Sequence, residues 1–259
     1  MSDLHVERKG QGRPVVLLHS SGLSGRQWRR IERDVVARGA TAIVPDLTGH
    51  GQSQEWTEPT PFSFEIDVDR IASLVATEDS PVHLVGHSYG GFVALKAAAR
   101  APARVASLTL IDPVAFGVLA DDASGAGKQD LSRVDFEWTP TEVGRERWLR
   151  KFVDYWSGDG AWESLRDDAR REFLRVGWVV YEGARTLTQD RTAATAYAGI
   201  DAPVELVIGE LSPPAARRVV EILVGALPRA TRTELEGAGH MSPLTHNDRV
   251  SEAIVRAIG

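Results

Sequence analysis

Short, uninterrupted apolar runs alternate with longer segments of helical periodicity along this chain. The apolar runs lie at residues 15–18, 41–44, 82–85, 105–111 and 204–208. Continuous apolarity is typical of strands that are buried on both faces, as in a parallel sheet covered by helices. The helical candidates are residues 26–37, 64–76, 89–100, 213–227 and 242–258. This alternation predicts a doubly wound α/β sheet.

The alternation is interrupted once, between residues 112 and 202. No clear strand pattern occurs there, and the segment holds five of the seven tryptophans of the chain, namely Trp138, Trp148, Trp156, Trp162 and Trp178. A connection of this length with its own apolar content is typical of an inserted subdomain. We therefore predict an α/β core made of residues 1–114 and 201–259, and a helical cap, or lid, made of residues 115–200.

Composition narrows the class of protein. The 259 residues are 42% hydrophobic and 25% charged, as expected for a soluble globular domain. The net charge of −6 argues against a nucleic-acid partner, and the lack of cysteine excludes disulfides and thiol chemistry. The first ten residues lack the apolar segment of a secretory signal, and no apolar run has membrane-spanning length. We therefore expect a cytoplasmic protein without a membrane partner; its oligomeric state stays open.

The sequence GHSYGG at residues 86–91 joins a predicted strand to a predicted helix. It matches the G-x-S-x-G pattern of a nucleophile elbow, a sharp turn that exposes a serine at the edge of a sheet. The glycines leave room for this turn where side chains would collide. We predict that Ser88 is a nucleophile; a plain glycine-rich turn is the alternative.

Together with GHSYGG, three further stretches resemble the α/β-hydrolase family. They are LLHSSG at residues 17–22, DLTGHGQS at 46–53 and GAGHMSP at 237–243. The resemblance implies an α/β-hydrolase fold whose cap is inserted after the family's sixth strand, and a catalytic triad in the chain order serine, acid, histidine. Residues before Val15 suffice for one edge strand, so we expect the sheet to lack the family's first strand.

His240 is the predicted base. It lies in a glycine-rich loop between a predicted strand at 231–235 and the terminal helix, which brings it to the same sheet edge as Ser88. A neutral imidazole there can take the serine proton and return it to the leaving group. Asp46 precedes Ser88 in the chain, against the family's order, so we interpret it as structural.

The position of the triad acid in this sequence differs from the commonest pattern of the family. The usual position, within residues 209–214, holds Ser212, and a hydroxyl cannot neutralise an imidazolium. Some family members carry the acid one strand earlier, where this chain has Asp112 at the end of a predicted strand. Pro113 favours an extended backbone at Asp112. We predict Asp112 as the acid, with Glu210 as the alternative; an ordinary polar residue at a strand end is the other interpretation.

The oxyanion hole requires two backbone N–H donors. Tyr89, directly after the nucleophile, is one, and the resemblance assigns the other to Ser21. By the same resemblance, the lid chooses the substrate, and aromatic residues make the pocket apolar. Trp28, Trp138 and Trp178 are the candidate pocket residues.

These residues predict a carboxylesterase-like serine hydrolase that cleaves a small apolar substrate through an acyl-enzyme. Thioesters, lactones and the carbon–carbon bond of a diketone are alternative targets. Two further alternatives stay open, namely a cofactor-independent lyase, transferase or haloperoxidase-like enzyme, and a non-catalytic ligand receptor. The sequence lacks a metal-ligand constellation and a phosphate-binding glycine loop, so we expect no cofactor.

Overall fold

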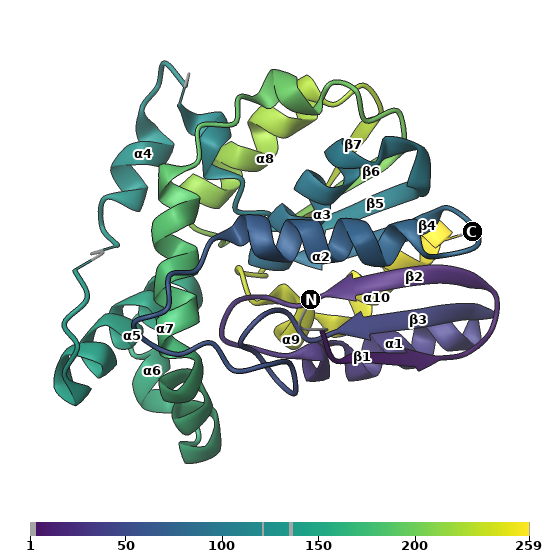
Figure 1. The fold of residues 1–259 in the computed structure, drawn as a ribbon. Coiled ribbons are helices and arrows are strands. Elements are labelled where there is room, and N and C mark those ends of the chain that lie inside the picture. Colours follow the sequence, from purple (N-terminus) through teal and green to yellow (C-terminus); the bar gives the residue numbers. More distant parts are fainter. Residues whose placement is uncertain (1–3, 121, 135–136, 259) are drawn as a thin grey trace.

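A computed structural model of the protein describes residues 4–120, 122–134 and 137–258. Seven strands form one sheet in the order β1-β3-β2-β4-β5-β6-β7 (Figure 1). Their bounds are β1 (Val6–Lys9), β2 (Arg13–Leu18), β3 (Ala40–Pro45), β4 (Val82–His87), β5 (Val105–Ile111), β6 (Val204–Gly209) and β7 (Ala230–Leu235). Only the pairing of β1 with β3 is antiparallel. The predicted α/β fold and edge strand are confirmed.

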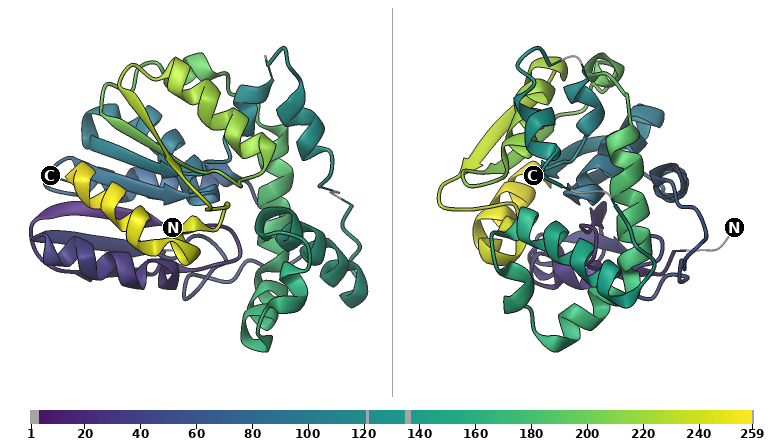
Figure 2. Two further views of the ribbon diagram at one scale, coloured as in Figure 1. Left: turned by 180° about the vertical axis from the view of Figure 1, so that it is seen from behind. Right: turned by 90° about the vertical axis from the view of Figure 1, so that its left-hand side faces the viewer.

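Helices cover both faces of the sheet (Figures 1 and 2). One face carries α1 (Arg29–Ala37) and α10 (Asn247–Ile258), and the other carries α2 (Phe64–Ala76), α3 (Tyr89–Arg100) and α8 (Pro214–Ala226). Each face of the sheet has its own hydrophobic core. Alternate residues of β2 pack into one or the other, because successive side chains of a strand point to opposite faces. Val15 and Leu17 join the core beneath α1 and α10, whereas Val16 and Leu18 join the core beneath α2 and α3.

In its described residues, the segment between β5 and β6 contains helices joined by loops, and no strand. It holds the 3-10 helices η3 (Phe116–Leu119) and η4 (Ala194–Tyr197), and the helices α4 (Ala126–Leu131), α5 (Glu142–Ser157), α6 (Ala161–Ser164) and α7 (Asp167–Gln189). Helix α5 begins after Thr141, whose side chain accepts a hydrogen bond from the Gly144 N–H. Helices α5, α6 and α7 lie beyond one end of the sheet (Figure 1).

The predicted terminal helix is divided in the structure. Residues 242–245 form the short helix α9 (Ser242–Thr245), and α10 begins at Asn247. The interruption falls at His246, whose backbone leaves the helical region. Within the described residues, none of the helices has the length and apolarity needed to cross a bilayer. A cytoplasmic location stays a prediction.

The register of the sheet decides which loops meet. In the pairing of β4 with β5, His87 lies opposite Ile111, so Ser88 and Asp112 both follow directly at the carboxyl edge of the sheet. β7 runs parallel to β6 at the same edge, and the loop after it carries His240. The three predicted catalytic residues therefore approach one another from separate loops.

Candidate active site

Ser88 lies in a strained turn between β4 and α3. Its φ of 55° is positive, a region that residues other than glycine rarely occupy. Its N–H donates to the Ile111 carbonyl at 2.9 Å, which ties the turn to β5. A Cβ at Gly86 would lie 2.3 Å from the Gly90 oxygen, and one at Gly90 would lie 2.4 Å from the Leu18 oxygen. The turn therefore requires both glycines.

His240 lies directly beside this serine. Its Nε2 is 2.9 Å from the Ser88 Oγ, and its side chain is buried. His87 contacts the loop that carries His240, because its Nε2 lies 2.8 Å from the His240 carbonyl oxygen. Because a carbonyl only accepts, Nε2 of His87 carries the proton. Burial and the neighbouring His240 hold the pKa of His87 well below its usual value, so this ring is neutral.

Asp112 approaches the other side of the His240 ring. Its Oδ1 lies 3.4 Å from the His240 Nδ1, somewhat beyond an ordinary hydrogen bond, and its Oδ2 accepts from the Gly209 N–H at 3.3 Å. The predicted extended backbone at Asp112 is wrong, because φ is 45°. The N–H of Asp112 still bonds the Val207 carbonyl, as in the sheet, while the chain turns sharply into Pro113.

Glu210, the alternative acid, and Ser212, which occupies the usual acid position of the family, have different surroundings. Glu210 is exposed, and its Oε2 accepts from the Gly237 N–H at 2.8 Å, so it holds the glycine-rich loop rather than the His240 ring. Ser212 is buried, and its hydroxyl has no hydrogen-bond partner among the described residues. The structure thus brings Asp112, and not Glu210, to the His240 ring.

Ser21 and Tyr89 lie on the wall of the same hollow as Ser88. Tyr89 is the first residue of α3, where a backbone N–H has no acceptor within the helix. In the described parts of the chain, neither the Ser21 N–H nor the Tyr89 N–H donates to a protein acceptor. Both groups are therefore available to an oxygen atom bound next to Ser88.

The hollow above Ser88 has apolar walls. None of its twelve lining residues is charged; they are Ser21, Ser88, Tyr89, Val114, Phe116, Leu131, Val134, Phe152, Trp156, Ala184, Leu187 and Thr188. Trp156 also packs on the His240 ring, with 4.1 Å between the ring centroids and an interplanar angle of 32°. The helical segment therefore supplies most of the surface that a substrate would meet.

None of the three tryptophans predicted for the pocket lies among these lining residues. Trp28 is fully buried in the core beneath α1 and α10. Trp138 stacks on Tyr181 at 4.8 Å, and Trp178 donates from its indole N–H to the Thr60 carbonyl at 2.7 Å. The prediction is wrong because these rings find partners elsewhere in the protein.

The aromatic residues that line the pocket are instead Tyr89, Phe116, Phe152 and Trp156. Phe152 and Trp156 are four residues apart on α5, so they share one face of the helix. This spacing is visible in the sequence, but it does not distinguish a helix face that lines a cavity from one that packs on a neighbouring element. No group of three or more His, Asp or Glu among the described residues is arranged to hold a metal ion.

Comparisons with known proteins agree with this architecture. A model described as "Alpha/beta hydrolase family" matches residues 15–253. The lipase LipV of Mycobacterium tuberculosis is 40% identical over 114 residues, which are 43% of this chain and 42% of the lipase. The chain thus aligns with about two fifths of the length of that relative. A pimeloyl-[acyl-carrier protein] methyl ester esterase of Aeromonas hydrophila is 27% identical over 98% of both chains.

Solved structures share the fold along the whole chain. An esterase from Exiguobacterium antarcticum superposes with a TM-score of 0.75 over 98% of this chain and 95% of its own, at 17% identity. A meta-cleavage product hydrolase from Pseudomonas fluorescens IP01 gives a TM-score of 0.73 over 98% and 93%, at 19% identity. Fold, site arrangement and family match lead to one conclusion: this chain belongs to the alpha/beta hydrolase family.

Proposed function

We propose that this protein is a serine esterase that cleaves the carboxylic ester of a small, apolar acid. One observation carries the proposal: the Ser88 Oγ lies 2.9 Å from the His240 Nε2, with the Asp112 carboxylate on the far side of the ring. This arrangement has the order of nucleophile, base and acid that acyl transfer requires. The names of the relatives, a lipase and a methyl ester esterase, support an ester as the target.

In the first step, the Ser88 oxygen attacks the carbonyl carbon while its proton moves to the His240 Nε2. The carbonyl oxygen gains the negative charge and receives hydrogen bonds from the Ser21 and Tyr89 N–H groups. Asp112 stabilises the imidazolium. The bond between the carbonyl carbon and the alcohol oxygen then breaks, and His240 gives its proton to that oxygen.

In the second step, water replaces the alcohol. His240 takes a proton from the water as its oxygen attacks the acyl carbon, and then returns the proton to the Ser88 oxygen when the acyl bond breaks. The products are the free acid and the regenerated enzyme. No cofactor enters this sequence.

We further propose that residues 115–200 act as the lid. Phe116, Phe152, Trp156 and Leu187 line the hollow above Ser88 and come from this segment. Because the lining residues carry no charge, an apolar acyl group is favoured over a charged one at this position.

A fluorophosphonate probe tests the proposal. The intact protein should gain the mass of one phosphonyl group at Ser88 and lose its turnover of p-nitrophenyl butyrate, whereas Ser88→Ala should gain no mass and show no turnover. Equal melting temperatures of the two proteins would show that the substitution leaves the fold intact. Turnover by Ser88→Ala at the rate of the unchanged protein would contradict the proposal. A ligand that binds tightly without being consumed would favour a receptor instead.

A further inference from the structure

A buried hydrogen bond anchors the side chain of Tyr89, a residue that lines the hollow. The Tyr89 hydroxyl donates to the Asp67 Oδ2 at 2.9 Å. Asp67 lies on α2 and is fully buried. Burial and the Asp67 carboxylate raise the pKa of Tyr89 well above its usual value, so the phenol keeps its proton and stays a donor.

The other oxygen of Asp67 binds the loop that follows β3. Its Oδ1 accepts from the Thr48 N–H at 3.0 Å and from the Thr48 hydroxyl at 2.5 Å. That hydroxyl in turn accepts from the Arg70 guanidinium at 2.5 Å. The buried carboxylate therefore has hydrogen bonds on both oxygens and a positive charge nearby, which together offset the loss of hydration.

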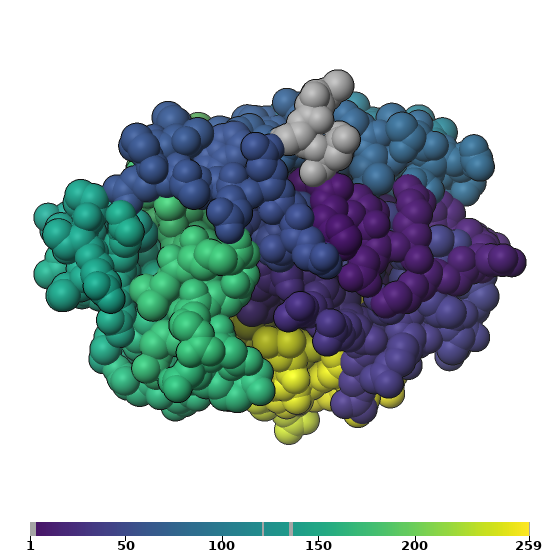
Figure 3. Space-filling model, turned by 60° about the horizontal axis from the view of Figure 1, so that its bottom comes forward, coloured from purple at the N-terminus to yellow at the C-terminus, as the bar shows by residue number. Residues whose placement is uncertain are grey.

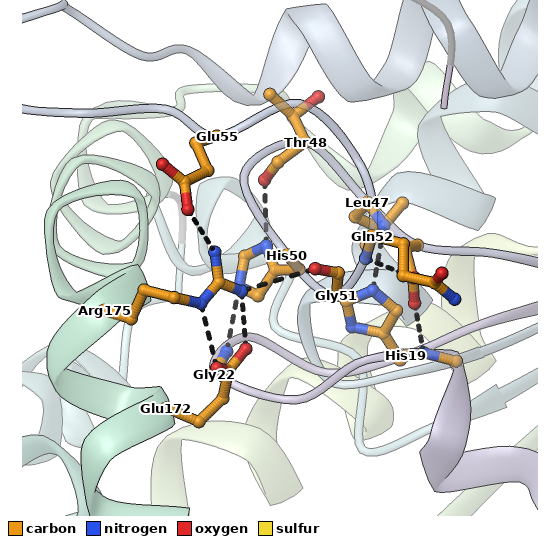
Figure 4. A network of polar contacts seen from close by, with 12 residues as sticks. His19, Gly22, Leu47, Thr48, His50, Gly51, Gln52, Glu55, Glu172 and Arg175 are labelled. Carbon is orange, nitrogen blue, oxygen red and sulfur yellow. Dashed lines mark hydrogen bonds and ion pairs between the residues drawn. The ribbon is translucent and has the colours of Figure 1, made fainter. Parts of the chain in front are cut away.

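His50 extends this chain of contacts to the loop that contains Ser21. Its Nδ1 lies 2.9 Å from the Thr48 carbonyl oxygen, and its Nε2 lies 3.0 Å from the Gly22 N (Figure 4). Because the carbonyl only accepts and the Gly22 N–H only donates, the proton is on Nδ1 and the lone pair is on Nε2. Burial lowers the pKa of His50 to about 4, so the ring is neutral and keeps this tautomer.

Helix α7 of the cap contacts the same loop. Arg175 pairs with Glu172 at 2.6 Å on its own helix, and reaches the Glu55 carboxylate and the Gly51 carbonyl, each at 3.5 Å (Figure 4). Figure 3 shows this side of the molecule, with the green atoms of the cap against the blue ones of the segment that follows β3. The cap thus rests next to His50.

These contacts form a continuous path from one candidate oxyanion donor to the other. The path runs from Tyr89 through Asp67, Thr48 and His50 to Gly22, which follows Ser21. We propose that Asp67, Thr48 and His50 are positioning residues that fix the spacing of the Ser21 and Tyr89 N–H groups. The inference rests on the proposed function, in which those two groups bind the oxyanion.

The physical need for such a path lies in the loop itself. Residues 19–22 leave the sheet after β2, and none of the strands in the described part of the chain pairs with them, so side chains such as Gln27 and His50 hold their N–H groups instead. Oxyanion donors act only when they point, at about 2.7–3.1 Å, to where the charge develops. A loose loop would still bind substrate but would stabilise the transition state less, so the effect should fall on kcat rather than KM.

Replacement of His50 tests the inference with p-nitrophenyl butyrate as substrate and a trifluoromethyl ketone as transition-state mimic. The ketone forms an oxyanion when Ser88 adds to it. His50→Ala should lower kcat by about 10- to 100-fold and leave KM within about twofold. Its affinity for the ketone should fall by the same factor as kcat. His50→Gln, whose amide oxygen can accept from Gly22, should regain most of this loss.

The matched control is His83→Ala. His83 is also a buried histidine, but its Nδ1 contacts the Ser107 hydroxyl within the sheet, away from this path. His83→Ala should have the same kcat and the same affinity for the ketone as the unchanged protein. Equal losses in both variants, or a loss of kcat without weaker ketone binding, would overturn the inference.

Tyr89→Phe is a second variant, in case His50→Ala fails to fold. It keeps the backbone N–H and removes only the hydroxyl that binds Asp67, so we expect about tenfold lower kcat and equally weaker ketone binding. Unchanged values for a folded Tyr89→Phe would count against the path. All folded variants should still react fully with a fluorophosphonate, because Ser88 is intact. Failure of the unchanged protein to react would instead contradict the proposed function.

Discussion

The carboxyl edge of the sheet and the helical segment above it hold their side chains by different means. At the sheet edge, backbone bonds fix the turns: the Ser88 N–H bonds the Ile111 carbonyl, and the Asp112 N–H bonds the Val207 carbonyl. On α5, Phe152 and Trp156 are held by contacts between rings. The proposed chemistry thus depends on strand register, whereas the shape of the pocket depends on side-chain packing. Substitutions in the two regions should therefore have different consequences.

The largest effect on activity should come from Asp112. We expect Asp112→Asn to lower kcat by about 1,000- to 10,000-fold, because the imidazolium loses its charged partner. Glu210→Gln should stay within about twofold, since Glu210 binds the Gly237 N–H and is exposed. Steady-state kinetics with p-nitrophenyl butyrate measure both. A large loss in Glu210→Gln alone would show that the acid comes from the loop after β6.

Replacement of Trp28 should lower the stability of the protein without changing its acyl preference. It is fully buried beneath α1 and α10, so Trp28→Ala should lower the free energy of unfolding by about 3–5 kcal/mol. Trp178, half-buried on α7, is the control, and Trp178→Ala should lose less than about 2 kcal/mol. Urea denaturation measures both values. A change in acyl preference in folded Trp28→Ala would mean that the ring reaches the pocket after all.

The neutral His50 predicts how stability depends on pH. The folded pKa is about 4, below the usual value near 6.5 in an unfolded chain. As pH falls from 6.5 toward 4, the unfolded chain gains a proton that the folded protein does not. The free energy of unfolding should therefore fall, by up to about 3 kcal/mol at pH 4. The stability that the neutral His50 contributes is fully present above pH 6.5.

His50→Gln isolates this contribution, because glutamine does not titrate. Its free energy of unfolding, measured with urea at pH 7 and at pH 4.5, should decline less than that of the unchanged protein. Parallel curves for the two proteins would indicate that the His50 ring is already charged or accessible to water in the folded state.

The smallest effect should come from the pocket wall. Trp156 packs on His240 and lines the hollow, so Trp156→Leu should shift the preference among p-nitrophenyl esters toward longer acyl chains. We expect a change of about 10-fold in the ratio of kcat/KM for octanoate to that for acetate. Trp178→Leu, on a ring that does not line the pocket, should leave this ratio unchanged. Equal shifts in both variants would point to a general loosening of the cap.

Uninterrupted apolar runs predicted β2, β3, β4, β5 and β6, because these strands are buried along nearly their whole length. Helix α3 begins and ends where periodicity placed it, at residues 89 and 100. The meeting of Ser88, His240 and Asp112 was also predictable, since parallel strands bring the loops at their carboxyl ends to one edge. The positive φ of Asp112 was not, because the proline that follows favours an extended conformation.

The pocket residues were the hardest to predict. An aromatic side chain on an amphipathic helix can face the helix's own neighbours or a cavity, and its spacing is the same in both cases. Trp148 and Trp156 both lie on α5, yet one packs edge-on against Tyr181 and the other packs on His240. Only the tertiary arrangement of α5 and α7 distinguishes them. The roles of His50 and His87 as hydrogen-bonded braces likewise depend on contacts far apart in the sequence.

The position of Asp112 at the end of β5 has a consequence for how this protein could change. From β6, the Asp112 carboxylate accepts a hydrogen bond from the Gly209 N–H, and none of the three residues of the proposed triad lies in the turn that follows, at residues 210–213. Leu211 in that turn is 69% exposed, and it borders the same surface hollow as Trp156 and His240. The backbone of the turn still holds the histidine loop, because the Leu211 N–H donates to the Ala238 carbonyl at 2.8 Å and the Glu210 carboxylate accepts from the Gly237 N–H. Replacement of the exposed Leu211 side chain, with the backbone of the turn unchanged, is thus a permissive change beside the proposed active site, through which evolution or protein engineering could alter substrate recognition.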